Sequence, residues 1–256
     1  MLVQGVTVVI NKKFTEATFL RILTEYKITI LNIVPTILDF LIKHPAVDNY
    51  DLSALKFIFV GAAKCEESHL RALKERLPDV QDVVQLYGLT EAGMLIFTTP
   101  VGNTRLSSVG RPMPGVEAVV VGEGKECLKN NEIGELVVRS PSMMEGYLGH
   151  GDINPDGWLQ TGDLARIDDE GFVYIVGRIK DMIKVRGWQV NPYEIEEAIK
   201  ANIADVKDCA VVGVEYGKDG HRPKAFVVGD VDKNDVINFV KGAKEIIADL
   251  SFRLKH

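Results

Sequence analysis

The sequence has few cysteines, no apolar run long enough to cross a bilayer and no excess of positive charge. Cys65, Cys127 and Cys209 lie far apart without metal-ligand spacing, which excludes a disulfide scaffold and argues against a zinc site. The 30 basic side chains are outnumbered by 36 acidic ones, whereas proteins that bind nucleic acid through its phosphates are usually basic. We therefore expect no nucleic-acid partner, no membrane span and an intracellular location where thiols remain reduced.

The composition is that of a folded globular protein, with 46% hydrophobic and 26% charged residues among 256. Helical and strand-like patterns alternate over the first hundred residues, which predicts a mixed or parallel sheet covered by helices. From about Thr98 to Val176 glycines separate short alternating strands, which is typical of a small antiparallel barrel or sandwich, and after Gly177 the pattern becomes α+β. Helices are predicted over residues 15–26, 36–43, 66–77, 191–201 and 233–250, and strands over 6–10, 28–34, 56–60, 83–86, 116–121, 134–139, 172–176, 209–214 and 224–228.

Four segments stand out because small, polar and charged residues gather at predicted strand ends and turns. Each has an ordinary interpretation when taken alone: a strand-to-turn junction capped by Thr90, a hairpin, a tight turn and a solvated surface turn. Their order and spacing along the chain favour a common function. The segments are Gln85–Glu91 (QLYGLTE), Gly134–Tyr147 (GELVVRSPSMMEGY), Gly157–Asp163 (GWLQTGD) and Gly177–Glu196 (GRIKDMIKVRGWQVNPYEIE).

In this order the four segments resemble the core motifs of the adenylate-forming superfamily, in the branch of acyl-CoA synthetases, 4-coumarate–CoA ligase and firefly luciferase. The resemblance extends to Val34-Pro35-Thr36 and Gly61-Ala62-Ala63, and it is most specific over the string IKVRGWQVNPYEIE. It implies an α/β fold followed by α+β. Residues 1–100 would be the remainder of the αβ part of an N-terminal adenylation domain, 101–178 a small β-barrel subdomain, and 179–256 an incomplete, mobile C-terminal domain.

The resemblance also implies a two-step reaction. A carboxylate attacks the α-phosphate of ATP to give an acyl-adenylate and pyrophosphate, and the thiol of coenzyme A then accepts the acyl group. The implied substrate is a small carboxylic acid, and the implied cofactors are ATP or AMP, Mg²⁺ and coenzyme A. The expected compartment is the cytoplasm or the peroxisome.

The implied adenine site lies at two predicted strand ends. Gly61-Ala62-Ala63 would lie flat against one face of the ring, and Tyr87 would stack on the other. Gln85 and Gly88 belong to the same stretch and are assigned to nucleotide binding with it.

Four further residues are assigned to the phosphate, the metal and the sugar. The Thr90 hydroxyl suits a negative α-phosphate as a neutral donor, and Glu91 matches the family's Mg²⁺ ligand; both are assigned catalytic roles. Asp163 would accept hydrogen bonds from the ribose hydroxyls, and Arg178 would join it there as a donor.

The segment after Arg178 resembles the family's hinge, about which the C-terminal domain rotates between two states. Lys180 and Asp181 occupy the hinge positions. Lys184, which is assigned a catalytic role, and Gly187 fall in the loop that reaches the active site in the second state. A glycine there would admit the pantetheine arm of coenzyme A.

The sequence departs from the family pattern in several places. Lys64 replaces a proline after Gly61-Ala62-Ala63, Gln160 replaces a histidine, and the stretch 148–156 is shorter than the family's, which would affect the placement of Asp163. The family's Ser/Thr/Gly-rich phosphate loop and the aromatic-histidine motif of its acyl pocket are expected upstream of this sequence. Its adenylation lysine is expected downstream.

Three interpretations remain open. The first is a shortened or partial AMP-forming carboxylate–CoA ligase. The second is a catalytically inactive, truncated module that binds AMP or an acyl-adenylate or serves in interactions. The third is an incomplete gene product without an independent role. The first sheet is also expected to leave one apolar face uncovered, which predicts either aggregation, by self-association through that face, or a partner that covers it.

Overall fold

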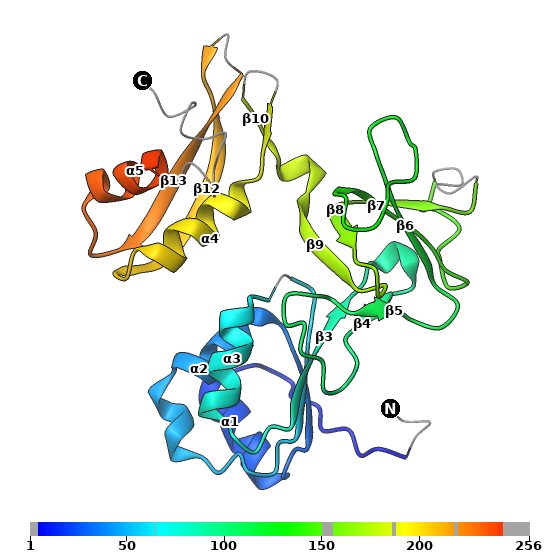
Figure 1. Ribbon diagram of the computed structural model, residues 1–256. Helices are drawn as coiled ribbons and strands as arrows, with labels where there is room; N and C mark the ends of the chain where they lie inside the picture. The colour runs from blue at the N-terminus through cyan, green and yellow to red at the C-terminus, as the bar shows by residue number, and fades with distance from the viewer. Residues whose placement is uncertain (1–4, 64, 150–155, 186–187, 218–219, 243–256) are drawn as a thin grey trace. The chain divides into compact units, whose positions relative to one another are not determined.

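The structure is a computed structural model that describes residues 5–63, 65–149, 156–185, 188–217 and 220–242. The chain divides into two compact units, which we describe separately (Figure 1). The first unit comprises Met1–Thr161 and Ala165–Ile175, and the second comprises Gly162–Leu164 and Val176–His256. The finer division into three parts stays a prediction.

The first unit contains a five-stranded sheet. Its strands, in the order in which they pair, are β1 (Ile30–Ile33), β2 (Phe57–Val60), β3 (Asp82–Tyr87), β4 (Phe97–Thr98) and β5 (Arg111–Pro112). β1, β2 and β3 are parallel, as the alternation of strand and helix predicts, and β4 and β5 add antiparallel strands. Val60 pairs with Gln85, so the chain leaves β2 and β3 at the same edge of the sheet.

Three helices lie on the same side of β1, β2 and β3 (Figure 1): α1 (Glu16–Glu25), α2 (Pro35–Lys43) and α3 (Glu67–Arg76). The Thr15 hydroxyl caps α1 by accepting a hydrogen bond from the Thr18 N–H at 3.2 Å, and Pro35 suits the first turn of α2. Each helix contributes two buried leucines that pack with Ile58 and Val60 of β2 in one core. Residue Ile30 of the edge strand β1 is 38% exposed, and self-association through such surface stays a prediction.

A second sheet pairs in the order β6 (Glu117–Val121), β7 (Gly134–Arg139), β8 (Leu159–Ile167) and β9 (Val173–Arg178). The strand-rich part predicted after residue 100 is thus present, but the described residues form an open sheet and no closed barrel. Closure would require β6 to pair with β9, whereas Val173 of β9 bridges to Gly110 instead. Leu136 and Val138 of β7 are buried with Phe97 of β4 in a second core of the first unit.

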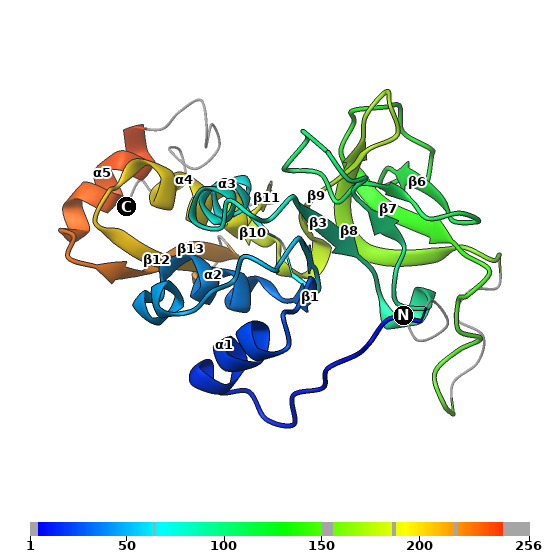
Figure 2. The same ribbon diagram turned by 90° about the horizontal axis from the view of Figure 1, so that it is seen from below.

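The second unit is an α+β arrangement, as the sequence predicts. Its elements are η4 (Ile179–Asp181), β10 (Ile183–Val185), β11 (Trp188–Val190), α4 (Pro192–Asn202), β12 (Val206–Glu215), β13 (His221–Gly229) and α5 (Lys233–Gly242). β10 pairs with β11 and β12 with β13, both antiparallel. Both helices lie on the same face of the β12–β13 hairpin (Figure 2), where Ile195, Ile199, Val211 and Val240 form a core.

The prediction of a buried strand over residues 6–10 is wrong. This segment forms no strand, and Val8 and Ile10 are 44% and 84% exposed. A run of β-branched residues favours an extended backbone, but a strand also needs a neighbour that accepts and donates its ladder hydrogen bonds. Among the described strands, none pairs with residues 6–10.

The thiols and the helices have the ordinary features of a globular protein. Burial raises the pKa of Cys65 to about 12 and that of Cys209 to about 11, so both are poor nucleophiles, whereas Cys127 is exposed.

The longest described helix has 11 residues, and none of the helices in the described ranges combines the length and apolarity that a membrane span requires.

Asn191 joins α4 to β9 within the second unit. It is 6% exposed, its Oδ1 accepts a hydrogen bond from the Tyr193 N–H at 3.1 Å, and its Nδ2 donates to the Val176 carbonyl at 2.9 Å. Asn191→Ala should therefore lower the free energy of unfolding of this unit by about 2 kcal/mol, since a helix cap and a buried hydrogen bond are lost together. Urea unfolding followed by circular dichroism would measure the change. Thr15→Ala is the matched control, since it removes only an exposed helix cap and should lower the free energy of unfolding by about 1 kcal/mol. If both variants lost the same free energy of unfolding, the hydrogen bond from Asn191 to the Val176 carbonyl would contribute no stability.

Candidate functional site

The turn after β2 lies beside the end of β3. A methyl group built on Gly61 would come within 2.7 Å of the Leu86 carbonyl oxygen, so glycine is required for this close approach. Ala62 has a left-handed backbone with φ of 71°, a conformation that costs a non-glycine residue about 1–3 kcal/mol and clusters at functional sites. Ala62 and Ala63 are both exposed. The structure thus presents the predicted adenine-binding turn at the carboxyl edge of the parallel strands.

Gln85 has a structural role that the sequence did not predict. Its side chain is 5% exposed, and its Nε2 donates hydrogen bonds to the carbonyl oxygens of Leu106 at 2.5 Å and Ser108 at 2.9 Å. These bonds tie the loop before β5 to the central strand of the sheet. The assignment of Gln85 to nucleotide binding stays a prediction.

Tyr87 and Gly88 end β3 and begin the next turn. The half-buried Tyr87 ring packs on Phe97 of the paired strand, with ring centroids 5.5 Å apart. A methyl group on Gly88 would overlap the carbonyl oxygen of Met94. The buried neighbour holds the tyrosine ring in one place, as a stacking platform for a base requires.

The turn η3 (Thr90–Ala92) carries the predicted phosphate and metal ligands. Thr90 is exposed and Glu91 is half-buried. The Tyr147 hydroxyl donates a hydrogen bond to Oε1 of Glu91 at 2.5 Å, and this bond raises the pKa of Tyr147. The turn therefore presents a hydroxyl that can donate to a phosphate oxygen and, at the next position, a carboxylate that can bind a hard cation.

Asp163 and Arg178, which the resemblance places at the ribose, form an ion pair within the second unit. Nε of Arg178 lies 2.9 Å from Oδ1 of Asp163, and the two side chains are 49% and 3% exposed. They come from β8 and β9, which are neighbours in the second sheet. Gly162 before the aspartate has a left-handed φ of 71°, a conformation that favours glycine. A carboxylate oriented in this way can accept hydrogen bonds from two vicinal hydroxyls.

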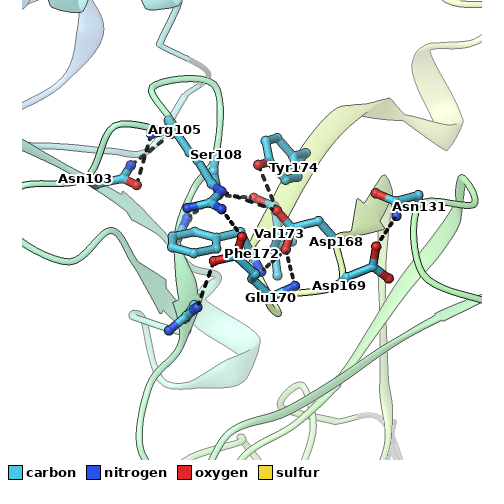
Figure 3. Close-up of polar contacts among 12 residues, drawn as sticks. Asn103, Arg105, Ser108, Asn131, Asp168, Asp169, Glu170, Phe172, Val173 and Tyr174 are labelled. Atoms are coloured by element: carbon cyan, nitrogen blue, oxygen red, sulfur yellow. Dashed lines mark hydrogen bonds and ion pairs between the residues drawn. The ribbon is translucent and has the colours of Figure 1, made fainter.

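The turn between β8 and β9 is held by polar contacts around Asp168 (Figure 3). Its carboxylate accepts hydrogen bonds from the backbone N–H groups of Glu170 at 3.0 Å and Phe172 at 2.9 Å. The Tyr174 hydroxyl donates a third at 3.0 Å, and Arg105 lies 4.5 Å from the centroid of the Phe172 ring. Burial acts to raise the pKa of Asp168, but these hydrogen bonds and Arg105 lower it below its ordinary value. This turn joins the two neighbouring strands that carry Asp163 and Arg178.

The predicted hinge and loop residues lie in the second unit. Lys180 and Asp181 belong to η4 and are exposed. Lys184 is exposed on β10, opposite Gln189 of β11. Gly187 lies outside the described residues, as does Lys64. The hinge and catalytic roles of these residues stay predictions.

The donor set fits a Mg²⁺ ion that arrives with a nucleotide. Within the described ranges, no group of three or more His, Cys, Asp and Glu side chains could hold a metal ion. Glu91 offers one carboxylate next to the Thr90 hydroxyl. Mg²⁺ is usually bound through one or two carboxylates, with phosphate oxygens and water as its remaining ligands.

Comparison with known proteins identifies the family. Residues 1–148 match the family model described as AMP-binding enzyme, and residues 194–253 match the model described as AMP-binding enzyme C-terminal domain. Because the first match spans more than half of the 256 residues, the chain belongs to the AMP-binding enzyme family. The resemblance inferred from the four motifs is confirmed.

Individual relatives agree with this result. The chain is 36% identical over 234 residues to a probable 4-coumarate–CoA ligase 3 of Dictyostelium discoideum and 37% identical over 235 residues to luciferin 4-monooxygenase of Photinus pyralis. Each comparison covers 89% of this chain and 42% of the relative. The structure of o-succinylbenzoate CoA synthetase from Bacillus subtilis, in complex with the acyl-adenylate intermediate OSB-AMP, matches with a TM-score of 0.80 and 27% identity over 94% of this chain and 50% of that one. The chain spans about half the length of the proteins that it matches.

Sequence reasoning did not assign a role to Tyr147, although it lies in a quoted motif. Its contact with Glu91 joins positions 56 residues apart in two different motifs. The sequence shows a tyrosine in one motif and a glutamate in another, but a single sequence does not show that Tyr147 and Glu91 are in contact.

Proposed function

We propose that this chain provides the adenosine-binding and hinge parts of an AMP-forming carboxylate–CoA ligase that acts on a small carboxylic acid. The match of residues 1–148 to the AMP-binding enzyme family carries this proposal. Two features of the structure support it: the buried Asp163 carboxylate beside Arg178, which suits ribose hydroxyls, and the Thr90–Glu91 turn, which suits phosphates and their metal.

The proposed reaction has two steps. A carboxylate oxygen of the substrate attacks the α-phosphorus of ATP, forming a P–O bond and releasing pyrophosphate. The thiol of coenzyme A then attacks the acyl carbon, loses its proton and displaces AMP. In this scheme a bound Mg²⁺ would neutralise negative charge on the phosphates, with Glu91 as its protein ligand.

The remaining residues take the roles that the family resemblance implies. The Thr90 hydroxyl donates to an α-phosphate oxygen, Tyr87 stacks on the adenine, and Asp163 orients the ribose. Lys180 and Asp181 absorb the backbone rotation of the second unit, and Lys184 acts in the thioester-forming state.

An ATP–pyrophosphate exchange assay with a panel of aromatic and fatty acids tests the proposal, together with a titration of the chain with AMP. Exchange above background is expected if the chain carries out adenylation. AMP binding without exchange would instead support a catalytically inactive binding module. Absence of both would contradict the proposal. Glu91→Gln is the control, because it should lower exchange while leaving the adenine and ribose contacts in place.

A further inference from the structure

The segment of residues 140–147 is held against the turn η3 by three hydrogen bonds. The Ser142 hydroxyl donates to the Ala92 carbonyl at 3.1 Å, and the Met144 N–H donates to the Glu91 carbonyl at 3.0 Å. The Tyr147 hydroxyl donates to Oε1 of the Glu91 side chain at 2.5 Å. Two of the three bonds therefore end on Glu91, one on its backbone and one on its carboxylate.

The backbone around Gly93 makes this close contact possible. Gly93 has a left-handed φ of 82°, and a methyl group built on it would come within 2.6 Å of Cβ of Ser142. The Ser142 N–H is in turn bonded to the hydroxyl of Ser140 at 3.3 Å. Ser142 and Met144 thus attach the segment to the backbone of η3, and Tyr147 adds a bond to the side chain of Glu91.

The Tyr147 side chain is suited to orienting the carboxylate. Tyr147 is 52% exposed, so its ring contributes little to the hydrophobic core. Its hydroxyl nevertheless lies 2.5 Å from Oε1 of Glu91. A hydrogen bond to a charged acceptor is about twice as strong as one between neutral groups, and it restricts the rotamers of the acceptor. A carboxylate has about four lone-pair sites, so it can accept this bond and bind a metal at the same time.

We propose that Tyr147 is a positioning residue, whose hydroxyl holds the Glu91 carboxylate in the orientation that binds the Mg²⁺ of a Mg²⁺–nucleotide complex. This inference rests on the proposed function, in which Glu91 is the protein ligand of that metal. Groups that hydrogen-bond a metal ligand commonly change metal affinity by about 10–100-fold. The half-exposed position of Tyr147 places the expected effect at the lower end of that range.

A double-mutant cycle with direct metal binding tests the inference. The probe is Mn²⁺ with α,β-methylene-ATP, which does not turn over, and binding is measured by water proton relaxation. Tyr147→Phe should weaken binding about 10-fold and Glu91→Gln by more than that, while the double variant should bind no more weakly than Glu91→Gln alone. The effects should not add, because Tyr147 acts through Glu91.

Tyr26→Phe is the matched control, since it removes the hydroxyl of another tyrosine that is 61% exposed, and it should not change binding. The urea midpoint of Tyr147→Phe should equal that of the unchanged chain. Tyr147→Phe binding as tightly as the unchanged chain, or losses that add in the double variant, would overturn the positioning role and leave the role of Glu91 intact. If the unchanged chain binds no Mn²⁺–nucleotide, the metal role of Glu91 fails, and the positioning role fails with it.

Discussion

Asp163→Ala is expected to abolish AMP binding, with a loss of affinity of at least about 100-fold. In the proposed site the Asp163 carboxylate accepts hydrogen bonds from the ribose, and each charge-assisted bond contributes about 1.5–3 kcal/mol. The fold should tolerate the change, because the side chain of Arg178 is 49% exposed and stays hydrated when its partner is removed. Isothermal titration calorimetry with AMP would measure the loss.

Asp169→Asn is the matched control for this experiment. Asp169 lies on the turn after the same strand, is exposed and accepts a hydrogen bond from Asn130 at 3.1 Å. Removing its charge should leave AMP affinity within about twofold, since surface charges contribute little. If Asp163→Ala bound AMP as tightly as the unchanged chain, the ribose assignment would be rejected.

Gly88→Ala should destabilise the first unit by about 3 kcal/mol. The added methyl group would overlap the carbonyl of Met94 and lie 3.0 Å from Cα of Leu95. These are backbone atoms, which no side-chain rotation can move away. Met94 is itself tied back by a hydrogen bond from its N–H to the Leu89 carbonyl at 2.9 Å. Urea unfolding of the variant would measure the loss.

The control for Gly88→Ala is Gly124→Ala in the same unit. The atoms near a methyl group on Gly124 belong to the flexible side chain of Glu126, which can move, so stability should change by no more than about 0.5 kcal/mol. Equal urea midpoints for the two variants would show that the backbone at Met94 can move to make room for a methyl group on residue 88. The expected difference would mean that the glycine of the YG motif is required by the fold even without a nucleotide.

Local signals predict the elements of this chain well. The helix predicted over residues 15–26 is observed at Glu16–Glu25, where the Thr15 cap begins it, and the strand predicted over 134–139 is observed at Gly134–Arg139. Asn191 and Pro192 likewise mark the start of α4. Caps, prolines and strand periodicity act over a few residues, so they can be recognised in a single sequence.

Features that depend on distant partners were not predicted. Residues 6–10 have the composition of a strand but no pairing neighbour among the described strands. In place of the barrel expected after residue 100, the described residues form an open sheet, in which Val173 of β9 bridges to Gly110. The buried amide of Gln85 holds carbonyls more than 20 residues away, at Leu106 and Ser108. The pattern of one segment does not contain the position of another, so such contacts required the structure.

The separate hydrophobic cores have a consequence for any melting experiment on this protein. The first unit contains two clusters of buried side chains and the second contains its own, built from α4, α5 and their strands. Cooperativity depends on shared burial, so heating should produce overlapping transitions with different midpoints. A single fitted Tm would average these events, and calorimetric traces of the chain should be fitted with at least two components.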